Sequence, residues 1–324
     1  MRTHEWTPIE RAAVIGALAV VMGALFVTTY TLALGDPVPH RIDAAVVGDP
    51  QAHPAAVSAV QGVADDSLDF TSYASLDEAR RAIDRQDVYA ALDLQATPPT
   101  LYVASAAGAS VARLLERVSA ADTEVRVVDA HPLASTDPSG LDIFYLMLIA
   151  TIIGFLTVFQ TRAQAGGLPL RHWVAFVVAF ALAASLVLAV VEGPILGRLH
   201  VPVPEVWGIL ALHLIAVMAF ASVMAVLIGR WAILPTWLFF VILGNTSSGG
   251  AVAPPLLPQP FAFISQWLPS GATVTSVRNA IYFHGNQHAR PLIVLGLWAT
   301  VLFAAMLWVS HSRGTSPGGA PAAS

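Results

Sequence analysis

The sequence predicts an α-helical integral membrane protein with six spans, arranged as one plus five, and a small α/β domain between the first two. Three observations lead to this prediction. An apolar segment opens the chain, about a hundred water-compatible residues follow it, and further apolar segments fill the second half of the 324 residues.

The spans are recognised by length, because a helix rising about 1.5 Å per residue needs roughly 20 apolar residues to cross the hydrocarbon. Segment 231–243 is short and contains Pro235, but it follows the preceding span after only Gly229 and Arg230. We expect it to be a spanning or broken helix that continues into Gly244. In chain order, the predicted spans cover residues 12–34, 143–159, 173–191, 206–228, 231–243 and 291–309.

The first span has an alternative interpretation as a cleaved signal peptide, since Ala33 and Gly35 are small enough for a cleavage site. Its apolar run is far longer than the usual signal-peptide core of about 7–15 residues. An uncleaved membrane anchor is therefore the favoured interpretation.

Orientation follows from arginine, because all 16 basic residues are Arg. If the N-terminus lies inside, the cytoplasmic pieces carry more Arg than the short outer loops, as the positive-inside rule requires. The cytoplasmic pieces hold Arg2, Arg11, Arg162, Arg171, Arg230 and Arg313, and the short outer loops hold Arg198, Arg278 and Arg290.

The predicted organisation therefore has five parts. They are a cytoplasmic N-terminus (1–11), a first transmembrane helix (12–35), an extracytoplasmic α/β domain (36–142), a five-helix membrane domain (143–310) and a disordered cytoplasmic tail (311–324). Arg in place of Lys and the abundance of Ala suggest a GC-rich bacterial genome, so the expected location is the bacterial inner (plasma) membrane.

Charge separates the halves of the molecule. Residues 36–142 contain seventeen acids and seven Arg, a net charge of −10, and the rest of the chain contains four acids and nine Arg, a net charge of +5. An acidic outer domain repels anionic polymers, so we expect no nucleic-acid partner. Cysteine is absent, which excludes disulfides and thiolate metal sites.

Within the acidic region, strands and helices are expected to alternate. Ser75 and Glu78 form a capping-box pattern that predicts a helix start. Such alternation favours a small α/β layer domain. The predicted strands are 41–47, 68–73, 88–94, 100–104 and 124–128, and the predicted helices are 55–64, 76–83 and 110–120.

Enzymatic signatures are missing. A phosphate-binding loop that ends in Gly-Lys-Ser/Thr is impossible without lysine. His284 and His288 have the spacing of zinc ligands, but Gly285 replaces the expected glutamate. His40, His53 and His131 are better explained as loop histidines than as a weak cation site. We therefore expect no catalytic site, no bound metal and no cofactor.

Ionisable residues inside the spans are informative, because a polar group in lipid needs a partner. His213 is the one clearly mid-span, where it either lines a polar path or bonds to a hydroxyl or carbonyl of a neighbouring helix. Glu192 and Glu205 stand at span ends, where water reaches them.

The most unusual stretch is residues 244–283, where glycines and prolines precede an aromatic run. Neither of its helical halves is long enough to cross a bilayer, so we expect a re-entrant or interfacial structure. Gly249 and Gly250 allow backbone conformations closed to other residues. Arg278 is expected at the start of the second short helix, near the headgroups or paired with Glu192 or Glu205.

This stretch, GNTSSGGAVAPPLLPQPFAFISQWLPSGATVTSVRNAIYF, resembles the segment after the fifth span in bacterial ABC-2 type transporter permease-like proteins, particularly the phage infection protein (YhgE/Pip) branch. Those proteins share the layout of one span, an outer domain and five spans, and residues 88–92 are similar to a strand of their outer domain. The residues that carry the resemblance are Gly244, Asn245, Ser248, Gly249, Gly250, Pro258, Pro269 and Arg278.

The resemblance implies a permease subunit that exports a lipid, glycan or hydrophobic small molecule with an ATPase supplied in trans, as a homodimer or hetero-oligomer among membrane lipids. Two alternatives remain. One is a non-transporting scaffold or receptor for a phage or an envelope partner, and the other is a sensor. The short cytoplasmic parts disfavour the sensor, since they could not carry an output.

Overall fold

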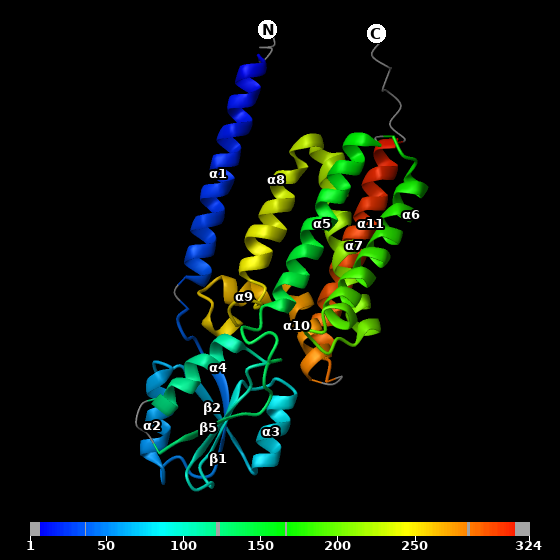
Figure 1. The fold of residues 1–324 in the computed structure, drawn as a ribbon. Helices are drawn as coiled ribbons and strands as arrows, with labels where there is room; N and C mark the ends of the chain where they lie inside the picture. The colour runs from blue at the N-terminus through cyan, green and yellow to red at the C-terminus, as the bar shows by residue number, and fades with distance from the viewer. Residues whose placement is uncertain (1–6, 36, 121–123, 166, 284–285, 315–324) are drawn as a thin grey trace, which may run out of the picture.

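The computed structural model describes residues 7–35, 37–120, 124–165, 167–283 and 286–314. Figure 1 shows three parts: a long first helix, a bundle of helices, and a domain built on a β-sheet at one end of both. We call residues 37–141 the sheet domain. The start of α1 (Pro8–Leu34) and the end of α11 (Ala289–Gly314) lie at the end of the molecule that is remote from the sheet domain.

The sheet domain contains a five-stranded mixed sheet with the order β2-β1-β3-β4-β5. β1 runs parallel to both β2 and β3, β3 and β4 are antiparallel, and β4 and β5 are parallel. The strands are β1 (Ile42–Val47), β2 (Leu68–Tyr73), β3 (Ala90–Asp93), β4 (Thr100–Val103) and β5 (Arg126–Asp129). The helices are α2 (Pro54–Val63), α3 (Leu76–Asp84) and α4 (Ala109–Leu115), the last extended by the 3₁₀ turn η1 (Glu116–Ala120).

All five strands and all three helices predicted for this domain are present, with ends that shift by a few residues. Ser75 caps α3 by accepting a hydrogen bond from the Glu78 amide at 3.3 Å. The carboxylate of Glu78 accepts from the Ala74 amide instead of the Ser75 amide, so only half of the predicted capping box forms.

Alternate residues of the central strands belong to two separate hydrophobic cores, because successive side chains of a strand point to opposite faces of the sheet. On one face, Ala44 and Val46 pack with α2 and α4. On the other face, Ala45 and Val47 pack with α3 and with Phe283 from beyond the domain. The short alanines of β1 and β3 let helices cover both faces closely.

Five stretches of the described chain are long and apolar enough to cross a membrane. They are Pro8–Leu34, Asp142–Gln164, Leu170–Ile195, Val203–Gly244 and Ala289–Ser312. The fourth is 42 residues long, about twice the length needed for one crossing. It is not one straight helix: α7 (Val203–Ile228) ends at Gly229, which has a positive φ of 62°, and the chain then turns back (Figure 1).

The returning stretch contains the predicted segment 231–243 and is irregular. A 3₁₀ turn, η3 (Gly229–Ala232), leads into α8 (Ile233–Thr236), and the π-helix η4 (Trp237–Gly244) follows. Pro235 has no amide hydrogen to offer the preceding turn, which accounts for a distorted helix at this point.

α7 is the central helix of the bundle. α5 (Asp142–Gln164), α6 (Leu170–Val190) and α11 all pack against it. Two-thirds of the most apolar part of the stretch Val203–Gly244, which contains α7, is buried, against about a quarter for the stretches that contain α6 and α11. Gly154 of α5 lets the helices approach closely, since a Cβ at that position would lie 3.0 Å from Val217.

α1 stands apart from the bundle, and no residue in the most apolar part of this helix is buried. It contacts η4 near its sheet-domain end, where the Tyr30 hydroxyl donates to the Val241 carbonyl at 3.3 Å. Phe26 stacks on Tyr30 with ring centroids 4.0 Å apart. Most apolar side chains of α1 are therefore exposed.

Residues 244–283, which we call the junction segment, lie between the sheet domain and the bundle (Figure 1). They form the short turn η5 (Pro254–Leu256) and the helices α9 (Phe261–Ser265) and α10 (Pro269–Tyr282). α10 begins at Pro269 and not at Thr273, because proline fits the first turn of a helix, where its missing amide hydrogen is not needed. Arg278 therefore lies in the second half of α10, and its predicted place at the helix start is wrong.

The other predicted boundaries also shift. α1 begins at Pro8, where Thr7 forms a full capping box with Glu10, so helix enters the predicted N-terminal segment 1–11. α11 continues to Gly314, so the predicted disordered tail 311–324 is helical in its first four residues, and the remainder lies outside the described residues.

Candidate functional site

The turn at Gly244–Gly250 is packed inside the molecule. Asn245 and Ser248 are buried, and the Ser248 hydroxyl donates to the Asn245 carbonyl at 2.8 Å and accepts from the Gly250 amide at 3.2 Å. Gly249 has φ +71°, a conformation that favours glycine. A Cβ on Gly250 would lie 2.9 Å from Phe144 of α5, so this turn has no room for larger residues.

Arg278 holds the turn from the side. It is 9% exposed, and its Nη2 donates to the Gly249 carbonyl at 3.0 Å. The predicted pairing with Glu192 or Glu205 is wrong: the Glu205 carboxylate accepts from Gln287 Nε2 at 2.6 Å, and Glu192 lies near Asp142 and Arg198. Within the described part of the chain, no carboxylate forms an ion pair with Arg278.

The two predicted prolines have different positions. Pro269 is buried at the start of α10, and the next residue, Ser270, lies directly beside Gly244. Pro258 precedes α9, and its carbonyl accepts from the Ala262 amide at 3.3 Å. Seven of the eight signature residues thus gather around the turn and α10, and Pro258 lies apart from them.

The junction segment is joined to the sheet domain by hydrogen bonds and by a shared apolar core. The His40 amide donates to the Pro255 carbonyl at 2.7 Å, and the Ala253 amide donates to the Ser110 hydroxyl at 2.9 Å. Gln86 donates to the side chain of Asn279 on α10. Leu256 and Leu257 are buried in the same cluster as the strands and α4.

His213 of α7 connects three helices and is fully buried. Its Nε2 lies 2.8 Å from the Thr151 hydroxyl of α5, and its Nδ1 lies 2.9 Å from the Thr273 hydroxyl of α10. The two hydroxyls also lie within donating distance of the carbonyls of Met147 and Pro269. A neutral imidazole has one nitrogen without hydrogen, so one threonine must donate to it in place of its own carbonyl. Of the two alternatives predicted for His213, the geometry matches hydrogen bonds to hydroxyls of neighbouring helices.

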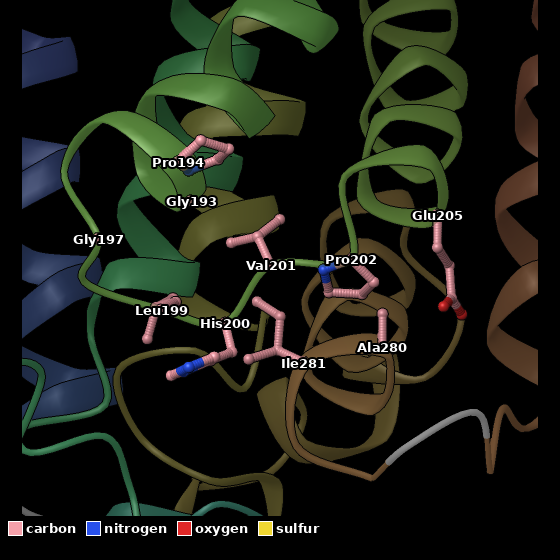
Figure 2. A pocket seen from close by; sticks show the side chains of 10 residues that line it. All are labelled: Gly193, Pro194, Gly197, Leu199, His200, Val201, Pro202, Glu205, Ala280 and Ile281. Atoms are coloured by element: carbon pink, nitrogen blue, oxygen red, sulfur yellow. The ribbon is translucent and has the colours of Figure 1, made fainter.

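An open groove of about 880 Å³ lies at the sheet-domain end of the bundle (Figure 2). Its walls are mostly glycine, proline and aliphatic residues from the turn after α6, the start of α7 and α10. Its polar side chains, His200 and Glu205, stand at opposite sides of the view in Figure 2. The groove therefore offers apolar surface and no cluster of reactive groups.

A second cavity, which we call the junction cavity, has a volume of about 230 Å³ and lies where the sheet domain, α10 and the start of α11 meet. It differs from the groove because cationic and hydroxyl side chains line it. The residues around it are Gln86, Val88, Tyr89, Ala107, Pro254, Thr275, Arg278, His288, Arg290 and Pro291. Of these, only Arg278 was a predicted site residue.

The sequence contained a weak signal for the others. Arg290 was counted among the few Arg of the outer loops, but Tyr89 and Gln86 come from a different domain, about two hundred residues earlier in the chain. Their meeting depends on how the sheet domain docks on the bundle, which local patterns do not specify.

The predicted histidines have separate surroundings. His131 Nε2 lies 2.6 Å from an Asp84 carboxylate oxygen, and His40 Nδ1 lies 2.5 Å from the Val38 carbonyl oxygen. His288 lines the junction cavity, and His284 lies outside the described residues. No group of three or more His, Asp or Glu side chains suited to a metal gathers in the described ranges.

Comparison of the chain with protein-family models, with curated proteins and with solved structures finds no match.

Replacing Gly249 by alanine should destabilise the protein. A Cβ would lie 3.1 Å from the Pro254 ring, and the positive φ adds strain of about 1–2 kcal/mol for a residue with a side chain. Thermal unfolding in one detergent should show a lower midpoint. The control is Gly296→Ala in α11, where the Cβ meets open space and helix propensity improves. Equal midpoints for the two variants would contradict the prediction.

Replacing Thr273 by valine should lower stability by about 0.6–2 kcal/mol, because it removes one hydroxyl from the buried His213 without changing the shape of the side chain. Ser185→Ala is the control, since among the described residues the Ser185 hydroxyl bonds to carbonyls of its own helix, those of Ala181 and Leu182. Denaturation in matched detergent measures both. If Ser185→Ala lowers stability as much as Thr273→Val does, the hydrogen bond between the helices contributes no extra stability, and the prediction is contradicted.

Proposed function

We propose that the chain is a permease-like subunit of the ABC-2 type in the bacterial inner membrane, which exports a lipid, glycan or hydrophobic small molecule with an ATPase in trans. The observation that carries the proposal is the continuous packing from the sheet domain through the junction segment into the bundle. Leu256 and Leu257 share a core with the strands, and Phe144 of α5 closes on Gly250. A movement of the bundle would thereby be transmitted to the sheet domain.

The centre of the bundle is filled at the level of His213, with Phe240 in edge contact at 6.3 Å between ring centroids. The groove of Figure 2 and the junction cavity lie at the sheet-domain end, beside the exposed apolar surfaces of the helices. This arrangement suits a molecule with a polar head and apolar chains, which enters from the side, better than a small solute passing along a central channel.

A scaffold or receptor role is the second candidate. A cavity of about 440 Å³ lies at the end of the sheet domain remote from the bundle, between the start of α2 and the start of β5. Pro54, Pro99 and Glu124 are among its lining residues. A partner bound there would contact the sheet domain without involving the helices, as expected of a receptor.

The proposed topology has six spans, with both termini cytoplasmic and the sheet domain outside. The reversal at Gly229 and the arginine distribution support it. Because cysteine is absent, single cysteines can report it directly. Cysteines at the exposed Ser58 and Ser119 should react with an impermeant thiol reagent in intact cells, and one at the exposed Ala165 should react only after permeabilisation. Labelling of Ala165 in intact cells would refute this topology.

If the permease proposal is right, the ATPase is a separate polypeptide. The purified chain in lipid should show no ATP hydrolysis above background, because a lysine-containing phosphate loop is impossible here. Purification in mild detergent from native membranes should retain an ATPase, identified by mass spectrometry. A preparation without any ATPase, but with a specific envelope protein bound, would favour the scaffold.

A further inference from the structure

The junction cavity is cationic, although it borders an acidic domain. Arg278 from α10 and Arg290 from the first turn of α11 line it together with His288. No Asp or Glu is among the described residues that line the cavity, whereas residues 36–142 carry a net charge of −10. Local positive charge in such a setting attracts an anion.

Arg278 supplies a buried donor directed at this space. Of the five N–H groups in its guanidinium, one, on Nη2, donates to the Gly249 carbonyl, and among the described residues this is its one side-chain hydrogen bond. Arg278 is nine-tenths buried and has no carboxylate partner among the described residues, so an anion that reached its guanidinium would offset the cost of burying the charge.

Neutral hydroxyl groups complete the lining. Thr275 precedes Arg278 by three residues on α10, so both side chains lie on one face of the helix. Burial raises the pKa of the Tyr89 phenol to about 12, an effect that the nearby Arg278 opposes, so this phenol keeps its proton and can donate. Side chains that can donate hydrogen bonds therefore line the cavity from the sheet domain, from α10 and from α11.

The cavity lies at the end of a candidate membrane span. Arg290 stands in the first turn of a candidate span, and its guanidinium carbon lies 4.8 Å from the centre of the Trp267 ring. Trp267 and Phe263 are exposed large aromatic residues of the junction segment. Exposed aromatic and arginine side chains at a span end are typical of the membrane interface.

We propose that the junction cavity binds the phosphate group of an anionic ligand. The forked guanidinium of Arg278 and the hydroxyls of Thr275 and Tyr89 match the several acceptor oxygens of a phosphate, and Arg290 adds a second cation to the lining. A phospholipid headgroup and a soluble phosphate ester share this chemistry. The site does not presuppose transport, so it stands or falls separately from the permease proposal.

The test measures binding to the full chain, purified in detergent, by calorimetry at constant ionic strength. Three probes separate the sources: dihexanoyl phosphatidylglycerol has phosphate and chains, dihexanoylglycerol has only chains, and glycerol 3-phosphate has only phosphate. The variants are Arg278→Gln and Arg290→Gln. Arg230→Gln is the matched control, because Arg230 is also exposed and stacked on a tryptophan, Trp231, at 5.3 Å, but lies at the opposite end of the bundle.

Phosphatidylglycerol should bind the natural chain, and its affinity should fall about tenfold in Arg278→Gln and about fivefold in Arg290→Gln, with no change in Arg230→Gln. Binding of dihexanoylglycerol should be the same in all variants. If glycerol 3-phosphate shows the same dependence on arginine, the ligand is a soluble ester; if only phosphatidylglycerol does, it is a lipid.

The proposal is overturned if Arg290→Gln and Arg230→Gln weaken phosphatidylglycerol equally, or if neither phosphate-containing probe depends on these arginines. Arg278 also supports the Gly249 turn, so Arg278→Gln carries the risk of unfolding. Arg290 is exposed and does not hold the turn, and its variant decides the question alone in that case.

Discussion

The junction segment must satisfy its backbone polar groups and cover its apolar side chains without forming a spanning helix, and this constraint organises the molecule. Backbone groups buried between the sheet domain and the bundle are shielded from water, so they need partners within the protein. The Gly249 carbonyl is satisfied by Arg278, and the Ala253 amide by Ser110. The sheet domain thus shields the junction segment from water, and the junction segment attaches the sheet domain to the bundle.

The second fixed point lies at the start of α5, where the chain leaves the sheet domain. Asp137 accepts hydrogen bonds from the amides of Leu141 and Asp142, which satisfies the free donors of the helix start. Asp142 in turn holds Arg198 through two bonds, of 2.7 and 3.3 Å. These bonds raise the pKa of the Arg198 guanidinium above its ordinary value. The loop between α6 and α7 is thereby fastened to the entrance of the bundle.

Local signals in the sequence were sufficient for the elements but not for their assembly. Strand β2 has the predicted bounds, because polar residues and turns delimit it on both sides, and Ser75 starts α3 as predicted. The change of direction between β3 and β4, after which β4 and β5 run opposite to the other three strands, leaves no local trace in the sequence. The sequence marked Arg278 as a site residue but predicted the wrong partner. Charge patterns indicate carboxylate partners, whereas the actual partner is the backbone carbonyl of Gly249, which depends on the positive φ of that turn. The junction cavity was missed for the same reason, since three distant parts of the chain compose it.

The isolation of α1 has an evolutionary consequence. Few side chains of α1 pack against other helices. Its sequence is therefore constrained by its length and its overall hydrophobicity, and hardly by the identity of each residue. Its sequence is free to drift among apolar residues, except near Phe26 and Tyr30, where it touches η4. In distant relatives of this chain, α1 should therefore diverge fastest among the helices, and α7, which every neighbour contacts, should diverge slowest.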